Sequence, residues 1–333
     1  MASFEALERA WYGKRQVPWW TWPVSSLYGG AVRLRMALYR RGRLRGVRLT
    51  VPVVVIGNLT VGGTGKTPLT IAVVEALLAR GYRPGVVSRG YGGAQHAPLL
   101  LGDAPDPALV GDEPCMIRGS GIPVAIGRDR PAAARLLVDA GCDLVVSDDG
   151  LQHYALARDV EVCVIDGVRR FGNRHLLPAG PLREPVSRLS RVDLRVCNGG
   201  TPEQGEYAMQ LVGSEAVTLV DGHRLPLQCF AGERVHGVAA IGNPQRFFTS
   251  LRAMGIEVVE HAFADHHRYL PTDLDFADEQ PVLMTDKDAV KCGAFAKPHW
   301  WHVPVRAQLP QAFFDALVQR IEATRRASGP RHS

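Results

Sequence analysis

Short runs of apolar, mostly β-branched residues alternate with longer segments of helix-forming residues through the first two thirds of the chain. The run VPVVVIG at 51–57 has no charged position, which is typical of a parallel strand buried on both faces. The segment 68–80 begins with a proline and is followed at once by a glycine, as helices often are. The alternation predicts a doubly wound α/β sheet, with strands at 51–57, 85–88, 144–147 and 160–165 and helices at 68–80 and 131–140.

The pattern is interrupted at 198–216, where turn-forming and polar residues predominate, and we expect a domain boundary there. A second α/β pattern follows a hairpin expected at 217–228. Its strands are expected at 235–241, 256–259, 282–285 and 302–306, and its helices at 244–254 and 310–325. The sequence thus predicts an N-terminal segment 1–50, a larger domain 51–200, a linker and hairpin 201–228, and a second, smaller α/β domain 229–333.

The strongest chemical signal is TVGGTGKT at 60–67, between the first predicted strand and the first predicted helix. Glycines let backbone N–H groups converge on phosphate oxygens, and the helix N-terminus adds a positive dipole end. Lys66 is then expected to reach the β- and γ-phosphates of ATP, and the Thr67 hydroxyl to bind Mg²⁺. The usual P-loop pattern has glycine at position 60, where this chain has threonine. The predicted nucleotide-binding residues are Thr60, Val61, Gly62, Gly63, Thr64, Gly65, Lys66 and Thr67.

Two other classes of protein also carry such a loop. Partner-regulated P-loop ATPases often have an extra lysine before the glycine pair, and this chain has Val61 at that position. The difference disfavours an obligate protein partner, although this class stays the alternative. A nucleic-acid-binding ATPase would bind nucleic acid with an affinity that falls steeply with salt.

Two pairs of acidic residues lie near predicted strands. Asp148 and Asp149 follow LVVS at 144–147, and carboxylates at the end of a neighbouring strand can hold Mg²⁺. Asp112 and Glu113, in VGDEP, are expected on a loop, where an aspartate can accept the proton of an attacking hydroxyl. The alternative for both pairs is a structural role in a turn or a helix cap.

Histidines and arginines supply further candidates. His266 and His267 lie in FADHHRY, and no other His or Cys is at metal-ligand spacing from them. The pair therefore predicts a proton relay with an acid, or else a polar surface turn. The segment 169–188 is rich in Arg, Gly and Pro, and we expect an ordered loop whose arginines recognise phosphate; a solvated loop is the alternative.

Composition and charge are unusual only in the N-terminal segment. Hydrophobic residues make up 46% and charged residues 22%, as in ordinary soluble proteins, and the six cysteines form no CxxC motif. A reducing compartment is expected. Residues 1–50 carry ten Lys/Arg and two Glu, a net +8, whereas the rest of the chain has 29 bases and 31 acids. The first 50 residues also contain four of the six tryptophans: Trp11, Trp19, Trp20 and Trp22.

Basic residues interleaved with tryptophan suit an anionic membrane surface, where the rings lie at headgroup depth and the cations meet phosphates. The longest uncharged stretch, 16–32, has 17 residues and is broken by Pro and Gly. It is too short to cross a bilayer, which needs ~20 apolar residues. We expect peripheral membrane binding, with a solvated basic face or a nucleic-acid patch as alternatives.

Taken together, the motifs resemble those of the tetraacyldisaccharide 4'-kinase family, the lipid A 4'-kinases. The resemblance runs from SLYGG near Leu27 to about Val305. It is carried by VVVIGNLTVGGTGKTP, VVSRGYGG, VGDEP, SDDGLQHYALARDVEVCVIDG, FGNRHLLPAGPLREP, IGNPQRFF, FADHHRY and TDKDAVK.

The resemblance implies transfer of the ATP γ-phosphate to the 4'-hydroxyl of a tetraacylated glucosamine disaccharide 1-phosphate, a step of lipopolysaccharide synthesis. It implies the cytoplasmic face of a Gram-negative inner membrane, with a P-loop kinase domain at 51–200 and the active site in a cleft closed by the smaller domain. Neither nucleic acid nor an obligate protein partner is implied. The implied roles are Lys66 and Thr67 in the loop, Asp148 and Asp149 near Mg²⁺, and Asp112 as the base with His266 or the adjacent His267. Further implied site residues are Glu113, Arg130, Arg183 and Glu184.

Overall fold

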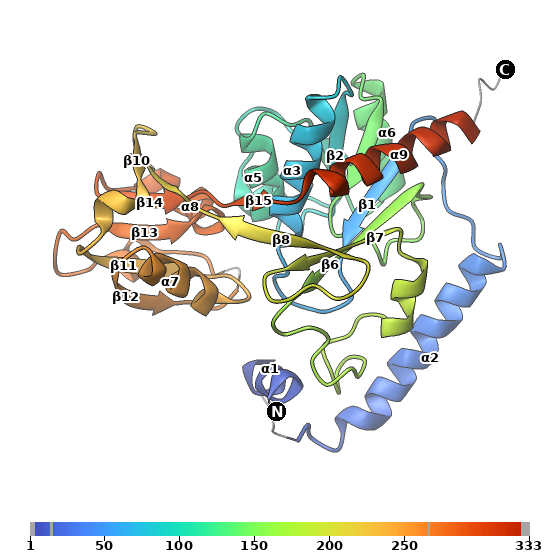
Figure 1. Ribbon diagram of the computed structural model, residues 1–333, viewed down its shortest axis with the longest axis horizontal. Coiled ribbons are helices and arrows are strands. Elements are labelled where there is room, and N and C mark those ends of the chain that lie inside the picture. Colours follow the sequence, from blue (N-terminus) through green and yellow to red (C-terminus); the bar gives the residue numbers. More distant parts are fainter. Residues whose placement is uncertain (1–3, 14–15, 266, 328–333) are drawn as a thin grey trace.

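The computed structural model describes residues 4–13, 16–265 and 267–327, and these residues form two sheets (Figure 1). The larger sheet has the strand order β15-β8-β7-β6-β1-β5-β2-β4-β3. All neighbouring strands from β8 to β4 are parallel, and only the edge strands β15 and β3 pair antiparallel. The predicted doubly wound sheet is therefore confirmed. Its strands are β1 (Val53–Gly57), β2 (Pro84–Ser88), β3 (Leu99–Leu100), β4 (Val124–Ile126), β5 (Leu144–Ser147), β6 (Val160–Asp166), β7 (Leu194–Asn198), β8 (Glu206–Val212) and β15 (Arg306–Gln308).

Helices cover both faces of this sheet, which explains why its central strands are apolar throughout. Every residue of β1 is buried. On one face α3 (Lys66–Leu78) and α9 (Gln311–Ala327) pack Leu69, Val73 and Phe313 into the core. On the other face α6 (Arg130–Asp139) packs Ala133 and Leu137. The phosphate loop thus follows a central strand of a rigid, fully packed sheet.

The smaller sheet has the strand order β10-β9-β14-β13-β11-β12. Its core contains the fully buried aromatic rings of Phe248 and Trp300. The hairpin expected at 217–228 is present as the antiparallel pair β9 and β10. The strands are β9 (Glu215–Thr218), β10 (Arg224–Pro226), β11 (Arg234–Ala239), β12 (Glu257–Ala262), β13 (Val282–Thr285) and β14 (Trp300–Val303), and the helices are α7 (Pro244–Ala253) and α8 (Asp286–Cys292).

The chain crosses between the two sheets twice, so the domain boundaries differ from those expected from the sequence. Strand β8 lies inside the stretch 201–228 expected as a linker and hairpin, yet it pairs with β7 of the larger sheet. Strand β15 and helix α9 lie inside 229–333, yet β15 pairs with β8 and α9 packs on the larger sheet (Figure 1). The smaller domain is therefore an insertion between β8 and β15.

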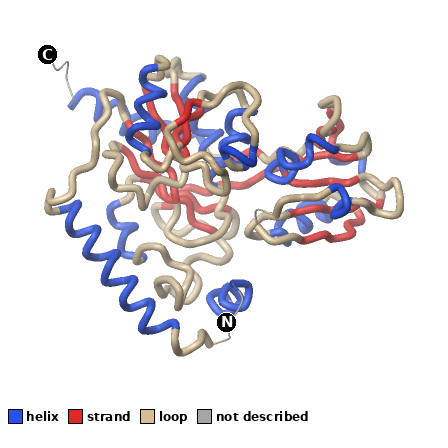
Figure 2. The backbone as a smooth tube through the Cα atoms, turned by 180° about the vertical axis from the view of Figure 1, so that it is seen from behind, coloured by secondary structure: helices blue, strands red, loops and turns tan. Residues whose placement is uncertain are grey.

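Two helices precede the larger sheet. Helix α1 (Phe4–Tyr12) is docked by Trp11, whose side chain is buried and donates a hydrogen bond to the Pro178 carbonyl (3.0 Å). Trp11 is thus a core residue, which corrects its expected place on a membrane-facing surface. Helix α2 (Thr21–Arg40) runs along the outside of the larger domain, as both views show (Figures 1 and 2). Of the helices in the described ranges, none is long and apolar enough to cross a membrane.

Candidate active site

The predicted phosphate loop connects β1 to α3 at the centre of the larger sheet. Gly62 and Gly65 have φ of 98° and 88°, a left-handed conformation that favours glycine. A Cβ at Gly65 would overlap the side-chain nitrogen of Asn198, which donates a hydrogen bond to the Thr64 carbonyl (2.9 Å). The glycines thus let the loop curl tightly and leave the N-terminus of α3 available to a phosphate.

Both domains hold this loop from outside. Arg169 Nη2 lies 3.3 Å from the Gly63 carbonyl oxygen, and the same guanidinium forms ion pairs with Asp166 and Glu8. Arg246, from α7 of the smaller domain, donates to Asn198 Oδ1 (2.7 Å) and so supports the hydrogen bond to Thr64. The arginine-rich segment expected as an ordered loop thus lies beside the phosphate loop. The roles of Asn198 and Arg246 were not predicted.

Lys66 lies at the start of α3 with its ammonium nitrogen 3.7 Å from Asp149 Oδ1. Arg183 contacts the same carboxylate at 2.9 Å. Although burial raises the pKa of Asp149, Lys66 and Arg183 lower it by more and hold it well below its usual range. Asp149 is therefore ionised, and the predicted residues Lys66, Arg183 and Asp149 lie together at the loop.

Asp148, the other member of the pair, is fully buried. Thr70 of α3 donates a hydrogen bond to Oδ1 (2.9 Å), whereas Oδ2 has no hydrogen-bond partner in the described chain. Burial and the nearby Glu113 carboxylate raise the pKa of Asp148 to about 7. A buried carboxylate oxygen without a donor is unfavourable by itself, and a cation beside it would satisfy it.

The backbone of the acidic pair is held in an unusual shape. Asp149 has φ of 46°, which few non-glycine residues adopt. Behind it, the buried Arg130 donates to Ser147 Oγ (2.7 Å), and its other terminal nitrogen lies 3.4 Å from the Asp149 carbonyl oxygen. Burial lowers the pKa of Arg130, and the two aspartates oppose this effect. Arg130 thus positions the acidic turn.

The residues fit Mg²⁺ bound together with a nucleotide. Mg²⁺ in phosphoryl-transfer sites takes one or two protein oxygens and completes its shell with phosphate and water. The Thr67 hydroxyl and the buried Oδ2 of Asp148 are oxygens of this kind. No group of three or more His, Cys, Asp or Glu side chains in the described ranges could hold a metal by itself. Mg²⁺ would therefore depend on the phosphates for the rest of its coordination.

The second acidic pair lies in the first turn of α5 (Asp112–Gly119), and not on a loop as expected. Two lysines of α8 approach it from the smaller domain. Lys291 Nζ is 3.9 Å from Asp112 Oδ2, and Lys287 Nζ is 3.9 Å from Glu113 Oε1. The sequence contains the i, i+4 spacing of these lysines, but only the tertiary fold places them opposite the acids.

Lys291 is the more deeply held of the two lysines. Its ammonium group contacts Asp288 Oδ1 (3.0 Å), donates to the His267 carbonyl (3.1 Å) and lies over the Tyr269 ring. The His267 side chain faces Asp273, with 3.0 Å between Nε2 and Oδ2. His266, the predicted partner of Asp112, lies outside the described residues.

A cavity of about 620 Å³ opens from the loop toward α2. Its wall includes Val61 of the phosphate loop, Asp149, Arg183 and Glu113 at one end and Tyr28 and Arg35 of α2 at the other. His153 also lines it, and burial together with neighbouring arginines lowers the pKa of this imidazole to about 4. His153 is thus neutral, and its buried Nε2 has no hydrogen-bond partner in the described chain. The sequence did not indicate that His153 lines this cavity.

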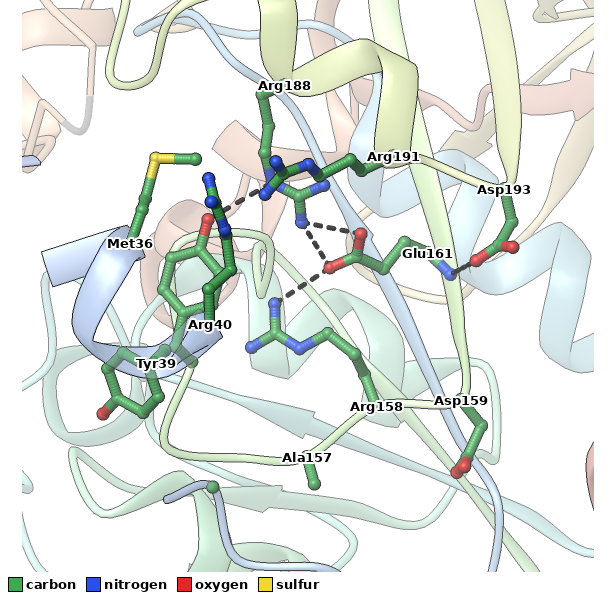
Figure 3. A pocket seen from close by; sticks show the side chains of 12 residues that line it. Met36, Tyr39, Arg40, Ala157, Arg158, Asp159, Glu161, Arg188, Arg191 and Asp193 are labelled. Carbon is green, nitrogen blue, oxygen red and sulfur yellow. Dashed lines mark hydrogen bonds and ion pairs between the residues drawn. The ribbon is translucent and has the colours of Figure 1, made fainter. Parts of the chain in front are cut away.

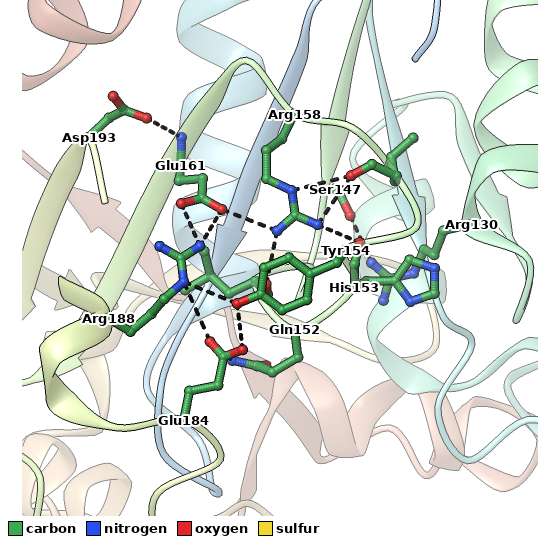
Figure 4. A network of polar contacts seen from close by, with 12 residues as sticks. Arg130, Ser147, Gln152, His153, Tyr154, Arg158, Glu161, Glu184, Arg188 and Asp193 are labelled. Carbon is green, nitrogen blue, oxygen red and sulfur yellow. Dashed lines mark hydrogen bonds and ion pairs between the residues drawn. The ribbon is translucent and has the colours of Figure 1, made fainter. Parts of the chain in front are cut away.

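Tyr154 lines both this cavity and a neighbouring hollow. Its hydroxyl donates to Glu184 (2.7 Å) and accepts from Arg188 (3.2 Å), within a buried network that continues to Glu161 (Figure 4). Burial raises the pKa of Glu184. Glu184, predicted as a site residue, lines the cavity. Its hydrogen bond from Tyr154 fixes the position of that ring in the cavity wall.

Comparisons with known proteins agree with this geometry. A family model described as tetraacyldisaccharide-1-P 4'-kinase matches residues 17–322. The chain is 52% identical to the tetraacyldisaccharide 4'-kinase of Stenotrophomonas maltophilia, over 95% of this chain and 96% of that protein. It is 51% identical to the enzyme of the same name from Nitrosococcus oceani, over 94% of both chains. The crystal structure of LpxK from Aquifex aeolicus in complex with ATP is 25% identical, with a TM-score of 0.74 over 90% of this chain and 98% of that chain.

Proposed function

Because the chain belongs to the tetraacyldisaccharide-1-P 4'-kinase family, we propose that it phosphorylates the 4'-hydroxyl of a tetraacylated glucosamine disaccharide 1-phosphate. ATP is the phosphoryl donor, and the product is an intermediate of lipid A synthesis. One observation carries the proposal: Val61 of the phosphate loop, one member of each acidic pair (Asp149 and Glu113) and side chains of α2 line one cavity. The cavity gives the disaccharide access to the γ-phosphate while α2 remains on the outside of the molecule.

Proton removal from the acceptor is assigned to Asp112. The 4'-hydroxyl oxygen forms a bond to the γ-phosphorus, the bond to the β–γ bridging oxygen breaks, and the hydroxyl proton passes to the carboxylate. Lys291 Nζ lies 3.9 Å from Asp112 Oδ2, so the smaller domain borders the proposed base. The family resemblance adds His266 as the partner of Asp112.

Charge on the transferring group is met by cations from two elements. Lys66 reaches the phosphates from α3, and Arg183 reaches them from the arginine-rich loop. Both now contact Asp149, so an incoming phosphate competes with that carboxylate for them. Thr67 and Asp148 would hold Mg²⁺, which when bound neutralises charge on the β- and γ-phosphates.

Helix α2 is proposed to dock the enzyme on the cytoplasmic face of the inner membrane, as a peripheral protein. Its exposed apolar side chains recur at helical spacing, at Trp20, Val24, Leu27 and Leu34. The opposite side of the helix is held to the body, where Ser25 donates to the Leu176 carbonyl (2.8 Å). The exposed arginines Arg41, Arg43 and Arg45 follow the helix and suit anionic headgroups.

The direct test is incubation of the purified protein with ATP, Mg²⁺ and the tetraacylated disaccharide 1-phosphate, followed by mass spectrometry of the lipid. Gain of one phosphoryl group at the 4'-position is expected, and it should be absent with Lys66→Ala. ATP hydrolysis that proceeds without lipid phosphorylation would contradict the proposal and favour a partner-regulated ATPase.

Membrane docking is tested separately with vesicles that contain phosphatidylglycerol. The variant Arg41→Gln/Arg43→Gln/Arg45→Gln should sediment less with the vesicles at low salt, because each cation near an anionic surface contributes ~1 kcal/mol. High salt should remove most of the difference by screening. Equal sedimentation of variant and wild type at low salt would argue against electrostatic docking.

A further inference from the structure

A second hollow, of about 420 Å³ (Figure 3), shares Met36 and Tyr154 with the 620 Å³ cavity beside the phosphate loop. It is bordered by the C-terminal turn of α2, the start of β6 and the 3-10 helix η1 (Val186–Arg191). We call it the arginine hollow, because four arginines line it: Arg40, Arg158, Arg188 and Arg191. Of its arginines, only Arg188 belongs to the segment 169–188 that the sequence predicted to recognise phosphate.

The carboxylates of the arginine hollow already have partners. Glu161 binds Arg188 through both oxygens and also contacts Arg158 (3.1 Å). The other two acids pair with arginines that do not line the hollow: Asp159 with Arg48 (2.7 Å) and Asp193 with Arg320 (2.9 Å). Arg40 and Arg191 form no ion pair with any described residue. The arginine hollow therefore has more positive than negative charge.

Arg188 is the most deeply buried of the four arginines. The Arg188 side chain is 5% exposed. Its Nε donates to Tyr154 and its Nη2 to Glu161, whereas Nη1 has no hydrogen-bond partner in the described part of the chain. Figure 3 shows the guanidinium groups of Arg188, Arg191 and Arg40 gathered on one side of the hollow, with no carboxylate between Arg40 and Arg191. Glu161 already neutralises Arg188, so the free positive charge of the hollow comes from Arg40 and Arg191, whose exposed side chains have no ion-pair partner among the described residues.

The chemistry of the lining specifies this anion. Planar guanidinium groups bind the oxygens of a phosphate through pairs of parallel hydrogen bonds. The lining also contains Met36 and the stacked rings of Tyr39 and Tyr154, whose centroids are 5.4 Å apart. The Tyr154 ring lies against the guanidinium groups of Arg158 and Arg188. This combination suits a phosphate joined to a glycerol or sugar group. The hollow also lies at the end of α2, the helix with the exposed apolar stripe.

We propose that the arginine hollow binds the phosphate of a lipid headgroup. Two sources have this chemistry: an anionic phospholipid of the surrounding membrane, and the 1-phosphate of the acceptor disaccharide, since the two cavities share Met36 and Tyr154. The second source rests on the proposed function, whereas the first does not require it.

The test compares Arg40→Gln/Arg191→Gln with the charge-matched Arg135→Gln/Arg234→Gln, whose exposed side chains line neither cavity. One arm measures sedimentation with phosphatidylcholine vesicles, with and without phosphatidylglycerol, at one moderate salt concentration for all three proteins, because the exposed Arg40 and Arg191 would be screened at high salt. The hollow variant should lose about tenfold in partitioning onto phosphatidylglycerol, and the control variant should match wild type, if the ligand is a membrane phospholipid.

The other arm measures phosphorylation of the acceptor in nonionic detergent. If the ligand is the 1-phosphate, the hollow variant should raise KM about tenfold with kcat unchanged, and the difference should vanish with an acceptor that lacks the 1-phosphate. An effect in either arm supports the proposal and identifies the source. Wild-type behaviour of the hollow variant in both arms overturns it. Absence of lipid phosphorylation by the wild type would count against the proposed function. The vesicle arm would still show whether the arginine hollow binds a phospholipid headgroup.

Discussion

Replacement of Asp148 by Asn should change the pH dependence of stability by an amount that follows from the site. Burial and Glu113 raise the pKa of Asp148 from 3.8 to about 7, so the folded protein holds this proton more tightly than the unfolded chain does. Ionisation of Asp148 therefore costs folding free energy. The cost is absent below the unfolded pKa, grows as the pH rises, and is complete above about pH 7, where it reaches ~4 kcal/mol.

The Asn variant does not carry this cost. Its amide places donors where the unpaired Oδ2 was, which costs about 1–3 kcal/mol, but that penalty is the same at every pH. Between about pH 5 and about pH 8.5, the stability of the variant relative to wild type should therefore rise by about 2–3 kcal/mol. At the higher pH, the Asn variant should therefore lose the proposed Mg²⁺ ligand but gain stability relative to wild type.

The assay is urea denaturation followed by circular dichroism at both pH values, with a chelator present. Asp139→Asn, which alters an exposed carboxylate at the end of α6, is the matched control and should show no comparable change. Added Mg²⁺ with ATP should stabilise wild type more than Asp148→Asn at the higher pH, since ligands stabilise the state that binds them. A difference in stability that stays constant between the two pH values would refute the argument from the buried carboxylate.

Four further outcomes are expected. Lys66→Ala should abolish lipid phosphorylation with an unchanged circular dichroism spectrum, and near-normal turnover would exclude its role at the phosphates. Asp112→Asn should lower kcat by ~10²–10⁴, the contribution of a positioned base, and a loss of less than tenfold would remove it from proton transfer. Lys291→Met should lower the free energy of unfolding by about 3–5 kcal/mol, because it leaves the buried Asp288 uncompensated; an unchanged urea midpoint would contradict this. Gly65→Ala should weaken ATP binding measured by calorimetry, since both its φ and Asn198 exclude a side chain, and wild-type affinity would show that the loop adapts.

The sequence alone located the phosphate loop and most strands, because these features are local. A glycine-rich segment between an apolar strand and a helix has few other interpretations, and the strand at 144–147 was placed with its observed ends. Gathering of the Asp148 pair, Lys66 and Arg183 at one edge of the sheet also follows from parallel strands, whose carboxyl ends share that edge.

Features that depend on distant parts of the chain were placed less well. The pairing of β15 with β8 joins residues almost one hundred positions apart, and nothing in either short strand indicates its partner. Trp11 belongs to a basic, aromatic segment by composition. Its burial depends on packing against the larger domain and on the hydrogen bond to the Pro178 carbonyl, which is distant in the sequence. The sequence likewise did not predict that the lysines of α8 approach Asp112 and Glu113, because this contact depends on the packing of one domain against the other.

The insertion of the smaller domain between β8 and β15 affects how the protein is synthesised. The C-terminal helix α9 supplies Phe313, Leu317 and Ile321 to the core of a sheet whose other strands leave the ribosome about one hundred residues earlier. During that interval, the apolar side of the sheet is exposed and open to chaperones or to aggregation. A stop codon or protease cut shortly before residue 306 would leave the phosphate loop and both acidic pairs intact in sequence. It would still remove the edge strand β15 and the covering helix α9. Residues 306–327 therefore determine whether the nascent chain can complete a stable larger domain.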